Sequence, residues 1–322
     1  MQFGLTEIQQ LTKNSAREFF SAEYPIAEVR RIMETPTAHD ASLWRKTAEQ
    51  GWCGMTIPEA YGGMGSGLVE IAAAMEEAGR ALVPGPLLAH LIATAAIAAG
   101  ANEEIKNRVL PALAAGEKIA TFADTTKLFV MDAAVADYVV AGPLLIEEFT
   151  ATPLPAIDLT RRLYAIDFAG GEWLGDGIEH ALAIGTTLLC AELTGGMQRM
   201  LDTTVAYVKT RKQFGKPVGA FQLVQALCAD MLVATESARS ATYFAAYALQ
   251  EGLPEAMSAV SVAKSYIGDA ARLTGNNAIQ AHGGMGFTWE NDIQLYYRRA
   301  KAGETAFGDA AYHRERIAQL VL

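Results

Sequence analysis

From residue 178 onward, the chain carries apolar residues at helical spacing with few interruptions. The segments that show this pattern cover about 178–210, 220–250, 255–281, 291–302 and 309–321. Apolar residues that recur every three or four positions are typical of a helix that buries one face. Because only short loops connect these four or five helices, the sequence predicts a helical bundle.

The first third of the chain also shows helical patterns, but its segments are shorter and are separated by turns. We expect helices over Glu7–Phe20, Trp44–Gly51, Glu70–Leu82 and Glu103–Ala115. Pro111 is expected to kink or end the last of these, because proline lacks the amide hydrogen that a helix interior needs. The Gly- and Pro-rich stretch Pro58–Gly65 is expected to form a turn-rich loop.

The middle of the chain has a different pattern. Short strand-like runs between Gly, Pro and Asp breaks occur at Val130-Met131, Tyr138–Ala141, Leu144–Ile146, Arg162–Ile166 and Glu172–Leu174. The sequence therefore predicts a mainly α protein with a small β insert. We place the three regions at 1–118, 119–176 and 177–322.

The composition excludes several classes of function. A formal net charge of -10 argues against nucleic-acid binding and gives little attraction to anionic lipid. Three widely spaced cysteines, Cys53, Cys190 and Cys228, show no metal-ligand spacing and no disulfide framework. Residues 1–7 lack the features of a signal peptide, and Leu87–Gly100 is too short to span a bilayer. We therefore expect a cytoplasmic protein without a metal site.

Two motifs in the last region carry chemical information. The first is Arg211-Lys212-Gln213-Phe214-Gly215, and the second is Gln280-Ala281-His282-Gly283-Gly284-Met285-Gly286-Phe287-Thr288-Trp289-Glu290. Adjacent glycines let an anionic group approach the main chain, because no Cβ stands in the way. An arginine offers a fixed positive charge with a forked donor geometry that suits a pyrophosphate.

In this order, the two motifs resemble the C-terminal domain of the acyl-CoA dehydrogenases, flavoenzymes that desaturate acyl-CoA thioesters. The loop Pro58–Gly65 resembles an N-terminal loop of the same family, and the order of helices, strands and bundle matches its fold. The resemblance implies an N-terminal helical domain, a truncated middle β-domain and a C-terminal four-helix bundle.

In this family, two subunits pack through their bundles, and each FAD lies across the interface. The resemblance implies that this chain reaches the neighbouring subunit's FAD through Arg211, Gln213, Phe214, Gln280, Gly283 and Gly284. The resemblance assigns FAD contacts to Val218 and Gln222 less firmly. For Gln222, an amide exposed on a helix surface is an equally good interpretation. His282 has two interpretations as well, a hydrogen-bond donor near the cofactor or a structural histidine.

The chain departs from the family in its middle region. Family members have a longer β-barrel with a hydroxyl-rich loop and a later Trp-Ile-Thr/Ser stretch that together hold the flavin ring. Here the first of these stretches corresponds to Ala120–Thr125, and Trp173 lies at the end of the region without a hydroxyl partner. We therefore expect that the chain has lost its own flavin-ring site.

The catalytic base is a second departure. Desaturation removes an α-proton from the thioester while a hydride leaves the β-carbon, so a carboxylate must lie beside the α-carbon. The resemblance places the family's Glu at Phe307, and the alternative position of a minority of members at Gly185. Asp309 and Glu304 are the remaining candidates, although a surface or helix-capping role suits Asp309 better.

CoA recognition is a third departure, because the helix that offers an Arg/Asp pair in the family corresponds here to Ala183–Leu188, which has no charge. The chain resembles the short subunit of bacterial heteromeric acyl-CoA dehydrogenases associated with steroid side chains and other bulky acyl groups. We therefore expect an α2β2 partnership with a longer paralogue that binds the acyl-CoA and supplies the base, together with an electron-transfer acceptor. A self-sufficient homodimer with a relocated base and a non-enzymatic scaffold or regulatory homologue are the alternatives.

Overall fold

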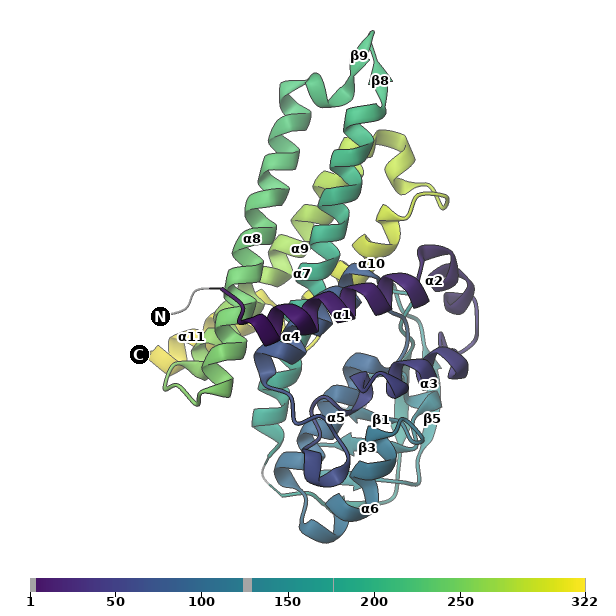
Figure 1. The fold of residues 1–322 in the computed structure, drawn as a ribbon, viewed down its shortest axis with the longest axis vertical. Helices are drawn as coiled ribbons and strands as arrows, with labels where there is room; N and C mark the ends of the chain where they lie inside the picture. The colour runs from purple at the N-terminus through teal and green to yellow at the C-terminus, as the bar shows by residue number, and fades with distance from the viewer. Residues whose placement is uncertain (1–3, 124–128, 176, 322) are drawn as a thin grey trace. The chain divides into compact units, whose positions relative to one another are not determined.

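The computed structural model describes residues 4–123, 129–175 and 177–321. Helices dominate this part of the chain, as the sequence predicted (Figure 1). The α-helices are α1 (Glu7–Glu23), α2 (Ile26–Met33), α3 (Ala41–Glu49), α4 (Leu68–Arg80), α5 (Leu87–Gly100), α6 (Glu103–Ala114), α7 (Ile178–Thr210), α8 (Gln222–Gln250), α9 (Ala256–His282), α10 (Ile293–Thr305) and α11 (Ala310–Val321). Short 3-10 turns include η2 (Glu59–Tyr61), η4 (Val218–Ala220) and η5 (Gly283–Phe287).

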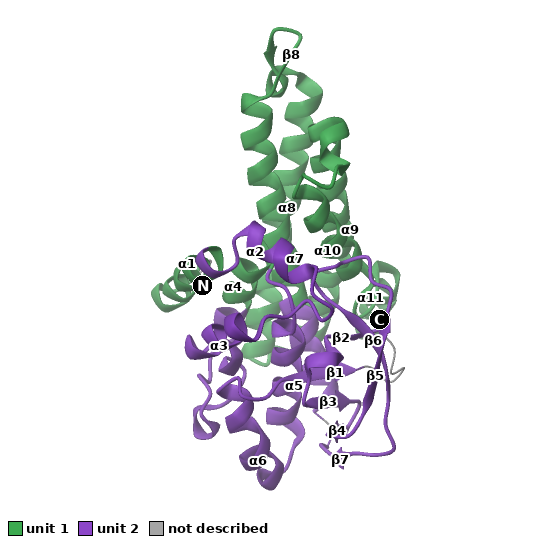
Figure 2. Cartoon of the chain, turned by 90° about the vertical axis from the view of Figure 1, so that its right-hand side faces the viewer, with its two compact units in different colours: residues 1–21, 72–82, 189–322 green, residues 22–71, 83–188 purple. Residues whose placement is uncertain are grey.

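Two compact units share these elements (Figure 2). Unit 1 consists of residues 1–21, 72–82 and 189–322, and unit 2 of residues 22–71 and 83–188. This division cuts across the three consecutive regions expected from the sequence. Most of α1 and α4 belongs with the bundle, while the other N-terminal helices belong with the strands.

Within unit 1, α9 packs against α8, α10 and α11. Its buried face is rich in Ala, Gly and Ser, and such small side chains let neighbouring helices approach closely. A buried carboxylate joins α1 and α4 to α8 in the same unit. Glu76 of α4 accepts hydrogen bonds from Lys13 Nζ of α1 at 2.6 Å and from Tyr243 Oη of α8 at 2.7 Å. This network explains why α1 belongs to the bundle unit.

In unit 2, α5 is buried over the whole of Leu87–Ile97. The apolar run that is too short for a bilayer is therefore a core helix. The short α2 was not predicted from the sequence, because eight residues give little periodicity to recognise. α6 continues through Pro111 to Ala114, so the proline does not end the helix. The expected loop Pro58–Gly65 contains η2 followed by Gly62 and Gly65 with positive φ.

The strands of unit 2 form two small sheets. They are β1 (Ala120–Ala123), β2 (Val130–Met131), β3 (Tyr138–Ala141), β4 (Leu144–Ile146), β5 (Thr150–Leu154), β6 (Leu163–Asp167) and β7 (Glu172–Trp173). One sheet has the order β1-β3-β4-β7 and the other β2-β6-β5. β1 pairs in parallel with β3, with Ala120 opposite Tyr138, and β5 pairs antiparallel with β6.

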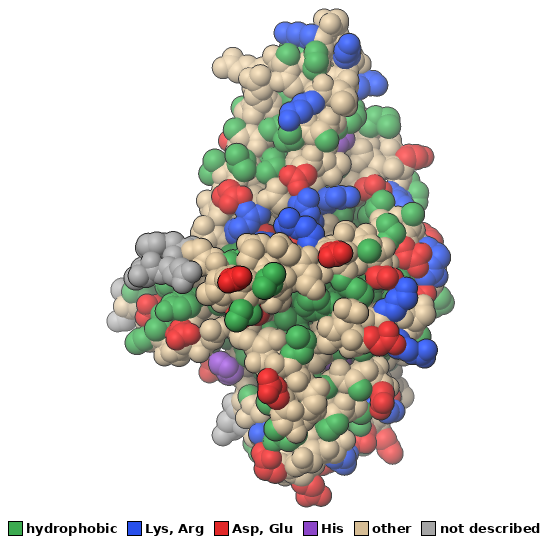
Figure 3. All heavy atoms as spheres, in the orientation of Figure 1, with side chains coloured by type: hydrophobic (Ala, Val, Ile, Leu, Met, Phe, Trp, Pro, Cys, Tyr) green, Lys and Arg blue, Asp and Glu red, His purple; other side chains and the backbone are tan. Residues whose placement is uncertain are grey.

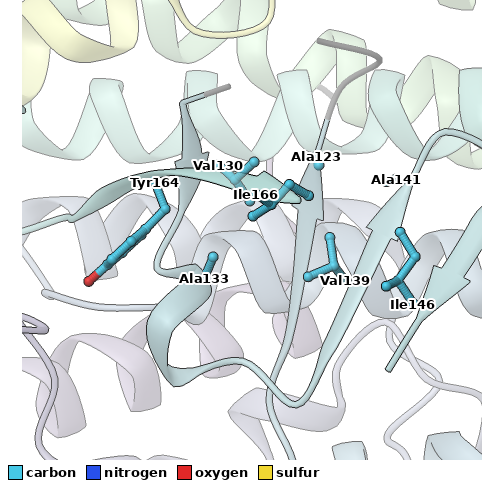
Figure 4. Close-up of a cluster of buried hydrophobic side chains, with 8 residues drawn as sticks. All are labelled: Ala123, Val130, Ala133, Val139, Ala141, Ile146, Tyr164 and Ile166. Carbon is cyan, nitrogen blue, oxygen red and sulfur yellow. The ribbon is translucent and has the colours of Figure 1, made fainter. Parts of the chain in front are cut away.

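Both sheets contribute side chains to one apolar cluster (Figure 4). The buried members of this cluster are Ala123, Val130, Ala133, Val139, Ala141, Ile146, Tyr164 and Ile166. Burial of this shared surface stabilises strands that are too short to pair stably on their own.

Two of these strands, β1 and β5, were not predicted from the sequence, for different reasons. β1 is rich in alanine, which has little strand preference, and its four residues are all buried. β5 contains Pro153, which weakens a strand assignment. The structure tolerates this proline because β5 is the edge strand of its sheet. The stretch Ala120–Thr125, which corresponds to the flavin-binding loop of the family, lies partly outside the described residues. These stop at Ala123 and resume at Phe129.

Candidate functional site

The Arg211–Gly215 motif forms a hairpin between two long helices of unit 1. α7 ends at Thr210, and the strands β8 (Lys212–Gln213) and β9 (Lys216–Pro217) pair antiparallel ahead of α8. Gln213 lies opposite Lys216, so Phe214 and Gly215 form the two-residue loop. The φ angles of both are positive, at 52° and 77°, as in a type I′ turn. The helices α7 and α8 carry this hairpin at their common end (Figure 1).

Phe214 is an unusual residue for this turn. A type I′ turn favours Asn or Gly at its first central position, because other side chains are strained at positive φ. The Phe214 side chain is 92% exposed, and its described ring contact is an edge-to-face approach to Phe221 at 6.2 Å. Neither burial nor turn geometry therefore accounts for a phenylalanine here.

The hairpin is a basic region of an acidic chain. Four basic residues lie within eight positions, and no Asp or Glu occurs anywhere over residues 203–229; the basic residues are Lys209, Arg211, Lys212 and Lys216. Lys and Arg side chains gather at this end of the bundle in the space-filling view (Figure 3). Arg211 is exposed, while its backbone is fixed, because its N–H donates to the Tyr207 carbonyl at 2.9 Å. The region therefore offers positive charge on a defined backbone.

The second motif forms the end of α9. Gly283 follows the last helical residue with φ 63° and ψ -145°, a conformation that is close to glycine-only. Its N–H donates to the carbonyl of Gln280, so this amide already has a partner in the helix end. A Cβ added at Gly284 would meet nothing within 4 Å, and φ there is not positive. Nothing in the described residues therefore requires a glycine at position 284.

A stacked ring pair brings the two motifs to the same end of unit 1. The Tyr207 ring of α7 lies on the His282 ring of α9, with centroids 4.3 Å apart and planes inclined by 19°. His282 Nδ1 bonds to the carbonyl of Ala278 at 2.8 Å, and because a carbonyl only accepts, Nδ1 carries the hydrogen. The His282 ring is buried, and this burial lowers its pKa. The geometry favours the structural interpretation of His282.

The remaining predicted contacts lie beside these two segments. Gln222 is the first residue of α8, and Gln280 lies in the last turn of α9, both with exposed side chains. Gln213 is exposed on β8, and Val218 begins the turn η4 that leads into α8.

The donor set fits a dinucleotide such as FAD. A pyrophosphate needs positive charge and an open backbone, and an adenine needs an exposed flat surface. Arg211 supplies the charge, Gly284 the open backbone and Phe214 an exposed ring. Sequence reasoning missed Tyr207, although an aromatic residue four positions ahead of Arg211 marks the same face of the final helical turn.

The position expected for a catalytic base holds a different arrangement. Phe307 is half-buried with φ 57°, and its carbonyl accepts from His313 Nε2 at 3.0 Å. The fully buried Lys264 donates to the carbonyls of Glu304 at 2.9 Å and Gly308 at 2.7 Å. Burial lowers the pKa of the Lys264 ammonium group. Two buried side chains thus hold the loop around Phe307 through its backbone.

The two alternative carboxylates have structural partners. Asp309 caps α11, since its Oδ1 accepts from the Tyr312 N–H at 2.9 Å. Glu304 is paired with Arg272 at 2.9 Å and with Lys301. These bonds occupy both acids without involving a substrate.

Gly185 has no room for a carboxylate side chain. It is buried in α7, and a Cβ there would lie 2.8 Å from Ile92 Cδ1. The neighbouring stretch Ala183–Leu188 is also helical and mostly buried. Neither position expected for a base therefore presents a carboxylate. Trp173, the tryptophan expected at the end of the middle region, lies on the edge strand β7, and its side chain is 61% exposed.

Comparison with known proteins decides the family. A model described as the acyl-CoA dehydrogenase C-terminal domain matches residues 175–322, and one described as the N-terminal domain matches residues 6–117. The chain belongs to the acyl-CoA dehydrogenase family. It is 35% identical over 312 residues to the acyl-CoA dehydrogenase IpdE2 of Mycolicibacterium smegmatis. The match covers 94% of this chain and 96% of that protein, so the two have similar lengths.

Solved structures share the acyl-CoA dehydrogenase fold. A variant of the steroid acyl-CoA dehydrogenase Tcur3481–Tcur3483 matches with a TM-score of 0.91 and 24% identity, over 98% of each chain. The ChsE4–ChsE5 complex from Mycobacterium tuberculosis matches with a TM-score of 0.91 and 23% identity, over 99% of this chain and 98% of that chain. In the described residues, no helix has both the length and the apolar content needed to cross a bilayer.

Proposed function

We propose that this acyl-CoA dehydrogenase family member is the FAD-contacting, non-catalytic subunit of a heteromeric enzyme. A longer paralogue supplies the flavin-ring site, the catalytic base and the CoA site in an α2β2 assembly. When bound, FAD supplies the acceptor for the hydride that leaves the β-carbon of the acyl-CoA. The residues of this chain bind the part of the cofactor that projects across the subunit interface.

One contrast carries this proposal: the segments suited to FAD are intact, while neither base position offers a carboxylate. Arg211 and Gly284 keep charge and open backbone at one end of the bundle. Phe307 has no group that accepts a proton, and Gly185 is closed by Ile92. A chain that retains only the cofactor contacts needs a partner that performs the proton abstraction.

The roles of the FAD-contacting residues follow from their chemistry. The Arg211 guanidinium binds the pyrophosphate through its forked donors, and Gly284 lets the phosphates approach the main chain. Phe214 presents its ring to the adenine, and Gln213, Gln222 and Gln280 offer amides to the polar groups of the adenosine half.

We further propose a CoA thioester of a steroid-derived or similarly bulky acyl group as the substrate of the complex, with a separate electron-transfer acceptor. The support is the fold shared with the steroid acyl-CoA dehydrogenase and the ChsE4–ChsE5 complex.

The test uses the native complex, captured from its source cells through an affinity tag on this chain. We expect a second, longer acyl-CoA dehydrogenase and bound FAD, with acyl-CoA-dependent reduction of an artificial electron acceptor. Arg211→Ala and Gly284→Val should each lower the FAD content of the complex at least about tenfold, because charge and backbone access are lost. Arg314→Ala, which alters an exposed arginine of α11, is the matched control and should keep full FAD.

Two outcomes would contradict this proposal. If the chain alone is yellow and reduces the acceptor with acyl-CoA, it is a self-sufficient homodimer with a relocated base. If Arg211→Ala and Gly284→Val leave FAD content unchanged, these residues do not hold the cofactor, and a scaffold or regulatory role is favoured.

A further inference from the structure

The Tyr207–His282 stack joins the end of α7, just ahead of the hairpin, to the second segment proposed to bind FAD. We propose that these residues are a positioning pair, which fixes the hairpin at residues 211–217 relative to the glycine turn at residues 280–284. One dinucleotide can then contact both segments without first ordering them. This inference rests on the proposed function, since it concerns the same cofactor site.

Each residue of the pair is joined through its backbone to a residue that the proposed function assigns to the cofactor. The Tyr207 carbonyl accepts from the Arg211 N–H at 2.9 Å, and the Arg211 carbonyl accepts from the Val218 N–H at 2.8 Å. A shift of Tyr207 therefore moves Arg211 and the base of the hairpin together. On the other side, His282 is the residue that immediately precedes Gly283.

Each segment is also packed against its own helix. A Cβ at Gly219, just after the hairpin, would lie 3.0 Å from the Val208 carbonyl oxygen of α7. A Cβ at Gly286, two residues after the glycine turn, would lie 2.7 Å from the Ile279 carbonyl oxygen of α9. Because each segment follows its helix, the distance between the segments depends on the two helix ends, which the stack joins.

The stack has the geometry of a fixed contact. The centroid distance of 4.3 Å and the inclination of 19° describe nearly parallel rings. The bond from His282 Nδ1 to the Ala278 carbonyl holds the imidazole in one orientation. Aromatic pairs of this kind contribute about 0.5–1.5 kcal/mol, which corresponds to a factor of about two to ten in an equilibrium constant.

The test measures the dissociation constant of FAD in the captured native complex after mild removal of the cofactor. Tyr207→Ala and His282→Ala should each raise this constant about five- to tenfold, while the rate at saturating FAD stays within about twofold. Tyr207→Phe and His282→Phe keep a ring and should restore affinity to within about twofold. The double alanine variant should be little worse than either single variant, because both remove the same contact.

Met231→Ala in the buried part of α8 is the control for general loss of stability. If it weakens FAD binding as much as the alanine variants at an equal drop in melting temperature, the pair has no positioning role. The same holds if the phenylalanine variants fail to rescue affinity. When Arg211→Ala loses FAD but Tyr207→Ala does not, this inference fails and the proposed function stands; when Arg211→Ala keeps FAD, the proposed function itself fails.

Discussion

Gly79 of α4 and Gly195 of α7 lie where the backbones of these two helices touch. A Cβ at Gly195 would come within 1.7 Å of the Glu76 carbonyl oxygen, and a Cβ at Gly79 within 1.9 Å of the Glu192 carbonyl oxygen. Neither helix can carry a side chain at this crossing. The contact attaches α4 to the bundle unit, although the two glycines are 116 positions apart in the sequence.

This crossing gives a sharp stability test with an adjacent control. Gly195→Ala should destabilise the chain by about 3 kcal/mol, because the obstructing atoms are backbone and cannot rotate away. At Gly196, the nearest atom to a new Cβ is 3.8 Å away, so Gly196→Ala should be neutral or stabilise the helix by up to about 1 kcal/mol. Denaturant unfolding of both variants checks this, and equal stability of the two would show that the helices do not cross as described.

Because Phe214 is strained in its turn and is proposed to contact FAD, we expect its replacement to increase stability and to weaken cofactor binding. Phe214→Asn should raise the free energy of unfolding by about 1 kcal/mol, because Asn-Gly suits the type I′ turn and relieves the strain at φ 52°. The same variant should lower FAD retention in the complex. Thermal unfolding and FAD content measure the two effects.

The control for this trade-off is Phe214→Leu, which removes the ring but keeps the strain. It should lose FAD as Phe214→Asn does, without the gain in stability. A clear loss of stability in Phe214→Asn would mean that the ring supports the fold and not the partner's cofactor.

His90 makes unit 2 sensitive to acid. Burial lowers its pKa to about 4, and its Nδ1 accepts from the Ala120 N–H at 3.2 Å. Protonation would place a second hydrogen against this N–H and separate α5 from β1. Since the folded pKa lies below the unfolded value of about 6.5, stability is full above about pH 6.5 and falls as the pH drops toward 4.

When the pH drops from about 7 to about 4.5, protonation of His90 should lower the free energy of unfolding by about 2 kcal/mol. His90→Asn keeps an acceptor near the Nδ1 position and removes the titration, so its unfolding free energy should fall less over the same range. Denaturant unfolding at both pH values gives the comparison. An identical pH dependence in the two proteins would assign the acid sensitivity to other groups.

The sequence predicted the fold best where periodicity is long or strands are apolar. The bundle helices follow the five predicted segments closely, and β3 and β4 match their predicted residues one for one. The sequence did not predict β1, because alanine has little strand preference, although burial makes this strand possible. It did not predict β5, because proline argues against a strand, although an edge position allows one. That Phe307 occupies the base position of the family stays a prediction from the resemblance.

The candidate site was only partly accessible to the same reasoning. Motif chemistry singles out Arg211 and Gly284, but it does not show that the Gly283 amide is already bonded to Gln280. It also gives no reason to join Tyr207 to His282, since 75 positions separate them by number. That contact exists because α7 and α9 end on the same side of their unit.

The sequence by itself therefore determined the order of helices and strands, the family, and the chemical character of the two motifs. These properties depend on residue types and spacings within short segments. Only the tertiary structure decided that parts of α1 and α4 join the bundle, that Gly79 faces Gly195, and that the two motifs meet through one ring pair. Such pairings depend on how distant segments pack together, which no local pattern of residues encodes.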